Sequence, residues 1–154
     1  MNKIKILIAD DHTIVRAGIR QLLETQPDFE IAADVENGRE ALEHAILHQP
    51  DVILMDLRMP EMDGVQAIKS IKAQQPNIHI LVLTTYDTDA DIVRAVNAGA
   101  TSYLLKDVPR EELFRAVRAT ARGETVLASS VAARLMGKVR SGGCLLYTSP
   151  SPRD

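Results

Sequence analysis

The chain has 154 residues, a formal net charge of −3 and a single cysteine, Cys144. This length suits one domain, because single hydrophobic cores typically run to roughly 100–200 residues. The lone cysteine excludes an internal disulfide framework, and no apolar run approaches the roughly 20 residues of a membrane-spanning helix. We therefore expect a cytoplasmic protein without membrane contact. The weakly acidic balance argues against a basic face that grips nucleic acid.

Four short apolar runs predict strands of a parallel sheet, and a fifth run, Ile31–Val35, shows the pattern more weakly. The four are rich in Ile, Leu and Val and alternate little with polar residues, which is typical of strands covered on both faces. The predicted strands are Ile4–Ala9, Ile31–Val35, Val52–Met55, Ile80–Leu83 and Tyr103–Leu105.

Segments with helical spacing follow each of these runs. Their apolar residues recur every three or four positions, so each segment presents one apolar face. The alternation of strands and helices implies right-handed crossovers and an α/β fold with helices on both sides of the sheet. The predicted helices are Thr13–Thr25, Arg39–His48, Val65–Gln74, Asp89–Asn97 and Arg110–Arg122.

Acidic residues follow two of the predicted strands. Asp10 and Asp11 come directly after the first strand, and Asp56 comes directly after the third. In a doubly wound sheet with strand order 2-1-3-4-5, these strands are neighbours at the point where ligands bind. Carboxylates gathered there repel one another unless a cation neutralises them, and oxygen ligands beside solvent favour Mg²⁺. An alternative is that one aspartate caps the helix beginning near Thr13.

A hydroxyl and an ammonium stand at the ends of the next two strands. Thr84 ends the fourth and Lys106 ends the fifth, so both are expected at the edge where the carboxylates lie. The lysine can hold an anionic oxygen as a point charge, and the hydroxyl can hydrogen-bond another oxygen. The sequence contains no Gly-x-x-x-x-Gly-Lys-Ser/Thr loop, which excludes a P-loop. This set favours phosphoryl transfer to an aspartate, which forms an acyl phosphate.

Four motifs in this order resemble the receiver domain of two-component response regulators. The resemblance covers roughly residues 3–122 and implies a flavodoxin-like (βα)5 fold, a doubly wound parallel sheet. The motifs are Asp10-Asp11-His12, Leu54-Met55-Asp56-Leu57-Arg58-Met59-Pro60-Glu61-Met62-Asp63-Gly64, Leu83-Thr84-Thr85-Tyr86 and Tyr103-Leu104-Leu105-Lys106-Asp107.

The resemblance implies a phosphoacceptor and a metal site. By position, Asp56 matches the acceptor of the phosphoryl group. Asp10, Asp11, Asp56 and the backbone carbonyl of Arg58 match the residues that hold Mg²⁺, and Asp11 is the stronger candidate for direct contact within the acidic pair. A sensor histidine kinase would be the donor. The domain would be a signalling module that catalyses only its own phosphotransfer and dephosphorylation, rather than an enzyme in the usual sense.

The resemblance also implies a switch. Thr84 matches the switch hydroxyl, Tyr103 the switch aromatic and Lys106 the phosphate-binding lysine. Phosphorylation would then change the surface made by the fourth helix, the fifth strand and the fifth helix. Receivers of this family often pair through helix faces, so a homodimer is a further expectation.

The C-terminal part of the chain is predicted to lie outside the receiver, which spans residues 1–122. Residues 123–140 are predicted to form a linker with a short helix, and residues 141–154 a disordered tail that need not belong to the domain. Lys106-Asp107-Val108-Pro109 resembles the NarL/FixJ-type subfamily, whose members usually continue into a LuxR-type helix-turn-helix domain. The sequence ends before such a domain, so we expect the regulatory part of a transcriptional regulator, without DNA binding by this chain alone.

Three alternatives remain beside this interpretation. Asp-nucleophile phosphatases of the haloacid dehalogenase type have Asp-x-Asp after their first strand, whereas Asp10 and Asp11 are adjacent here. A receiver-like docking module would lack Asp56 or Lys106, and both are present. A stand-alone receiver acting through protein–protein contacts stays open. His12 is more typical of a solvent-facing or helix-capping residue than of a phosphate carrier.

Overall fold

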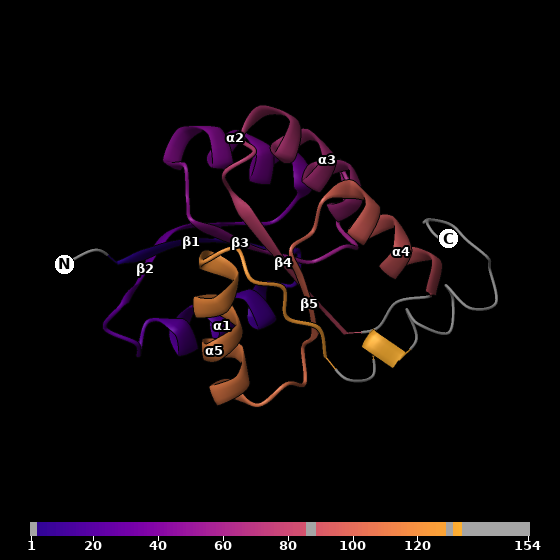
Figure 1. Ribbon diagram of the computed structural model, residues 1–154. Coiled ribbons are helices and arrows are strands. Elements are labelled where there is room, and N and C mark those ends of the chain that lie inside the picture. The colour runs from indigo at the N-terminus through magenta and orange to yellow at the C-terminus, as the bar shows by residue number, and fades with distance from the viewer. Residues whose placement is uncertain (1–2, 86–88, 129–130, 134–154) are drawn as a thin grey trace.

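Five parallel strands form one sheet in the order β2-β1-β3-β4-β5 in the computed structural model, which describes residues 3–85, 89–128 and 131–133. This order confirms the predicted flavodoxin-like fold. Each strand is followed by a helix, because each crossover returns the chain to the same end of the sheet (Figure 1). The strands are β1 (Ile4–Ala9), β2 (Phe29–Val35), β3 (Val52–Met55), β4 (His79–Thr84) and β5 (Ser102–Leu105).

The helices cover both faces of the sheet. Helices α2, α3 and α4 pack on one face, and α1 and α5 pack on the other (Figure 1). A separate hydrophobic core fills each of the two interfaces, and the side chains of every strand are divided between them, as expected for a sheet covered on both faces. The helices are α1 (Thr13–Leu23), α2 (Gly38–His48), α3 (Gly64–Gln74), α4 (Asp89–Ala98) and α5 (Arg110–Ala121).

The second strand begins two residues earlier than the apolar run predicts. Phe29 is buried, meets the ring of Phe114 edge-on at 6.1 Å between centroids, and lies under the guanidinium of Arg118. Glu30 beside it is exposed and breaks the apolar pattern. Tertiary packing on α5 therefore extends β2 beyond the run that the sequence shows.

Short polar caps begin the helices that surround the carboxyl edge of the sheet. The side chains of Asn37 and Asp63 accept hydrogen bonds from backbone N–H groups in the first turns of α2 and α3. His12 is the N-cap of α1 and makes no side-chain cap bond, so neither aspartate before it occupies the cap position. These caps fix where each loop leaves the edge and therefore where its polar side chains lie.

The chain turns back along the sheet after α5. Gly123 takes a φ of 85°, which a side chain disfavours, and the following residues run beside β5. The division into a receiver over 1–122, a linker over 123–140 and a tail over 141–154 stays a prediction. Of the linker, the structure describes residues 123–128 and 131–133; the latter are helical, where a short helix was predicted, and the tail lies outside the described residues.

Candidate functional site

The predicted acidic residues meet at the carboxyl end of the sheet. Asp10 and Asp11 follow β1, Asp56 follows β3, and these strands are paired neighbours. Ligand atoms of the three carboxylates and of His12 all lie within 4.8 Å of one another. Asp10 and Asp56 are almost completely buried, while Asp11 is exposed at the rim. The sheet thus places two buried carboxylates beneath one that faces solvent.

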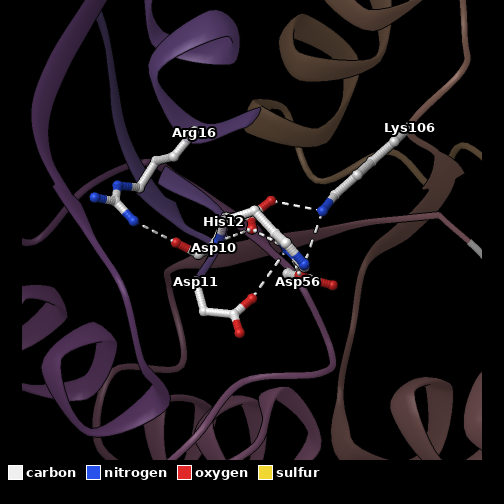
Figure 2. A network of polar contacts seen from close by, with 6 residues as sticks. All are labelled: Asp10, Asp11, His12, Arg16, Asp56 and Lys106. Atoms are coloured by element: carbon white, nitrogen blue, oxygen red, sulfur yellow. Dashed lines mark hydrogen bonds and ion pairs between the residues drawn. The ribbon is translucent and has the colours of Figure 1, made fainter. Parts of the chain in front are cut away.

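Lys106 supplies the cation that faces this cluster. Its Nζ lies 2.6 Å from Asp10 Oδ2 and 3.3 Å from Asp56 Oδ2 (Figure 2). The residue follows β5 directly, and its backbone N–H donates to the carbonyl oxygen of Thr84 at 2.8 Å. One lysine side chain therefore joins the first, third and fifth strands at their carboxyl ends.

Burial and charge shift the titration of this pair. Burial raises the pKa of the Asp56 carboxyl; the Lys106 ammonium opposes the shift, and the neighbouring Asp10 adds to it. Burial alone would lower the pKa of Lys106, but hydrogen bonds and charge from Asp10 and Asp56 outweigh it and raise the pKa. Lys106 is thus held charged, whereas the charge on Asp56 is disfavoured by its surroundings.

His12 lies over the acidic group. Its Nδ1 is 3.2 Å from Asp10 Oδ1, 3.1 Å from Asp11 Oδ1 and 3.9 Å from Asp56 Oδ2 (Figure 2). Its side chain is 63% exposed, which agrees with a solvent-facing residue. No local pattern in the sequence indicates that the imidazole reaches all three carboxylates.

Arg16 fixes the loop that carries the acidic pair. One of its guanidinium nitrogens donates to the backbone carbonyl of Asp10 at 2.6 Å (Figure 2). Its Nε donates to Asp34 at 2.9 Å. The side chain therefore ties the end of β1 to α1 and β2. Sequence spacing gave no signal for this role, because Arg16 reads only as a polar position on an amphipathic helix.

Thr84 and Tyr103 are both buried inside the fold. Thr84 ends β4 and is 2% exposed; Tyr103 lies in β5 and is 1% exposed. In the register of the two strands, Thr84 pairs with Leu105 and Tyr103 pairs with Val82. The predicted switch pair thus lies on adjacent strands, with the hydroxyl at the carboxyl edge and the ring deeper in the core.

Arg58 extends over the rim of the site. Its guanidinium pairs with Asp91 of α4 at 2.7 Å. The two residues line an open pocket of about 520 Å³ that also includes Asp11 and Arg94. The predicted role concerned the backbone carbonyl of Arg58, and that role stays a prediction. The side chain adds a contact between the loop after β3 and α4.

The charge balance of the site fits a divalent cation. Carboxylates at Asp10, Asp11 and Asp56 face one ammonium at Lys106, which leaves two negative charges at the edge of the sheet. Carboxylate oxygens are the ligands that Mg²⁺ prefers, and the exposure of Asp11 leaves room for the water molecules that this ion retains. The donor set therefore suits a hard, partly hydrated ion.

Comparisons with known proteins agree with this geometry. A family model described as "Response regulator receiver domain" matches residues 6–118. The response regulator protein VraR of Staphylococcus aureus is 42% identical over 137 residues, which cover 89% of this chain and 66% of VraR. The chain belongs to the response regulator receiver family. It spans slightly less than two thirds of the length of VraR.

Solved structures show the same fold. A two-component response regulator of the LuxR family from Aurantimonas sp. SI85-9A1 superposes with a TM-score of 0.84 at 29% identity, over 92% of this chain and all of that one. A structure described as two RcsB dimers bound to two parallel DNAs superposes with a TM-score of 0.79 at 29% identity, over 88% of this chain and 69% of that one. The relatives are thus response regulators of two-component systems, and receiver domains of this kind are signalling domains.

Proposed function

We propose that Asp56 accepts a phosphoryl group from a sensor histidine kinase. A carboxylate oxygen of Asp56 attacks the phosphorus of a phosphohistidine, the P–N bond breaks, and the imidazole leaves with the electron pair. The product is an acyl phosphate on Asp56. The position of Asp56 carries this proposal: it is the buried carboxylate at the centre of the edge, flanked by Lys106 and beneath the exposed Asp11.

The surrounding side chains would orient the transferring phosphoryl group and offset the negative charge on its oxygens. Lys106, already 3.3 Å from Asp56, would hold an oxygen of the phosphoryl group, and the Thr84 hydroxyl would bind another. Asp11, Asp56 and the carbonyl of Arg58 would hold Mg²⁺, with Asp10 beside them. When bound, the ion would offset the charge that develops on the phosphoryl oxygens.

Phosphorylation of Asp56 would change the surface formed by α4, β5 and α5, which partners would then recognise. Drawing the Thr84 hydroxyl toward the phosphoryl group favours one position of Tyr103 on the adjacent strand, and this pair biases the surface above it. The relatives include RcsB, whose described complex holds dimers on DNA. We propose that this chain likewise pairs with a second copy and acts as the regulatory part of a transcriptional regulator. None of the helices in the described ranges is long and apolar enough to cross a membrane.

Phosphate uptake tests this proposal directly. The chain is incubated with acetyl phosphate and MgCl₂, with and without EDTA, and its intact mass is measured. We expect one phosphate per chain that is lost on acid treatment and absent in Asp56→Asn. Asp63→Asn is the matched control, because Asp63 caps α3 at the same edge and should leave uptake unchanged. Undiminished labelling of Asp56→Asn would contradict the assignment.

A further inference from the structure

The outer edge of β5 is covered by a segment that the receiver family match does not include. That match ends at residue 118, and β5 is the last strand of the sheet. Residues 124–128, which we call the strap, run parallel to β5 and form a bridge between Leu127 and Tyr103 (Figure 1). A bare edge strand would expose its unpaired backbone groups, and the strap pairs some of them.

Both backbone groups of Tyr103 bind the strap. The Tyr103 N–H donates to the carbonyl of Val126 at 2.9 Å, and the N–H of Ala128 donates to the carbonyl of Tyr103 at 3.1 Å. The residue before it adds a third anchor, because the Val126 N–H donates to Ser102 Oγ at 2.9 Å. The predicted switch aromatic is thus the residue to which the strap is fixed.

The side chains of the strap alternate across the sheet as those of a strand do. Val126 packs on the core beneath α1 and α5, whereas Leu127 packs on the core beneath α2, α3 and α4. Leu127 also lines a small cavity of about 140 Å³ with Tyr103 and with Val96 of α4. The strap therefore pairs with β5, lines a cavity together with α4, and packs on the core beneath α5, so it lies beside all three elements of the proposed output surface.

β5 joins the carboxylate site, through Lys106, to the strap, through Tyr103. Lys106 follows the strand and binds the carboxylates, and Tyr103 lies three residues before it, about 10 Å along an extended chain. Residues 124 and 125 are exposed and 126–128 half-buried, so the strap is less buried than β5, as is typical of segments that open locally.

From this arrangement we infer that the strap reports the state of Asp56 and that Ser102 positions it for this role. The inference rests on the proposed function. A phosphoryl group that binds Lys106 and Thr84 fixes β5 and the inward ring of Tyr103, and this favours the closed strap. Because coupling is reciprocal, a closed strap favours the phosphorylated arrangement to the same degree.

Amide hydrogen exchange of the full chain tests the coupling. Exchange of residues 124–128 is measured before and after phosphorylation with acetyl phosphate, while intact mass gives the phosphate content of the same samples. We expect phosphorylation to slow exchange at Val126 and Ala128 by at least about fivefold, the lower end of typical coupling between sites.

Two variants distinguish a response of the strap to phosphorylation from the constant protection that its pairing with β5 gives against amide exchange. Ser102→Ala removes the hydroxyl that anchors Val126; it should take up phosphate like the wild type but lose most of the phosphorylation-dependent change in the strap. Glu124→Gln is the control, since it removes only the exposed ion pair with Arg122 and should respond as the wild type does.

Each outcome has a distinct meaning. Complete phosphorylation of Asp56 without a change in strap exchange would overturn this inference and leave the proposed function intact. An equal response in Ser102→Ala and wild type would overturn the positioning role of Ser102. A chain that takes up no phosphate would contradict the proposed function, and the inference with it.

Discussion

The ammonium of Lys106 lies closer to Asp10 than to the proposed acceptor Asp56, at 2.6 Å against 3.3 Å. The charge of the lysine thus partly neutralises two buried carboxylates, and without the lysine both negative charges would stay buried without this partner. Removing one partner of a buried ion pair is strongly destabilising because the remaining charge stays desolvated.

Lys106→Met should therefore destabilise the chain in the absence of divalent ions, by an amount on the order of 3 kcal/mol. Added Mg²⁺ should recover more stability in the variant than in the wild type, because a competing cation is gone. Urea unfolding with EDTA and with MgCl₂ measures both effects. If Mg²⁺ raised the free energy of unfolding equally in the wild type and in Lys106→Met, Lys106 and the ion would not share the same carboxylates.

Gly64 permits the close approach of α3 to the backbone that carries Asp56. A Cβ at this position would lie 2.5 Å from the carbonyl oxygen of Asp56 and 2.6 Å from the Cα of Leu57. Gly64→Ala should cost about 1–3 kcal/mol of stability, as overpacking does, and should slow phosphate uptake.

Gly18→Ala is the matched control, because nothing lies within 4 Å of a Cβ at this exposed position in α1. It should stabilise the chain by about 0.5–1 kcal/mol through helix propensity. Urea unfolding of both variants checks the pair. A Gly64→Ala protein as stable and as readily phosphorylated as Gly18→Ala would refute the steric account.

Thr84→Ala should accept phosphate nearly as well as the wild type but fail to transmit it, because the hydroxyl that follows the phosphoryl group is missing. Amide exchange in α4 should then respond to phosphorylation in the wild type and in Thr84→Ser, which keeps the hydroxyl, but not in Thr84→Ala. An identical α4 response in all three proteins would assign the switch to another residue.

His79 makes stability depend on pH. Burial lowers the pKa of this imidazole, and the charge of Lys72 lowers it further. As pH falls, the unfolded chain takes up the proton first, so stability is complete above the ordinary histidine pKa of about 6.5 and declines below it.

Melting temperatures between pH 8 and pH 5 check this dependence. His79→Gln should flatten the decline, while His48→Gln, at the last residue of α2, where the ring stacks on that of His44, serves as the control. A decline of the same steepness in His79→Gln would assign the pH dependence to other groups.

Much of the fold follows from local patterns in the sequence. Apolar periodicity predicts the start of α1 at Thr13 and both bounds of β3 correctly. The end of α1 lies at Leu23, two residues before the predicted Thr25. The start of β2 at Phe29 was missed because packing against α5, a contact between residues far apart in the chain, decides it.

The same distinction holds at the site. The order of the strands brings Asp10 and Asp56 together, so their proximity could be predicted from topology. The contact of Arg58 with Asp91 and the fixing of the strap to Tyr103 depend on loop paths that no local pattern encodes. Such contacts are where the structure adds most to the sequence.

The most direct test of the account is to locate the phosphoryl group by chemical reduction. An acyl phosphate on an aspartate is reduced by borohydride to homoserine, which mass spectrometry of peptides assigns to one position. After incubation with acetyl phosphate and MgCl₂, we expect homoserine at position 56 alone, and none in the presence of EDTA. Homoserine at Asp10 or Asp11 instead, or a phosphorylated chain that borohydride leaves unchanged, would contradict the assignment of Asp56 as the phosphoacceptor.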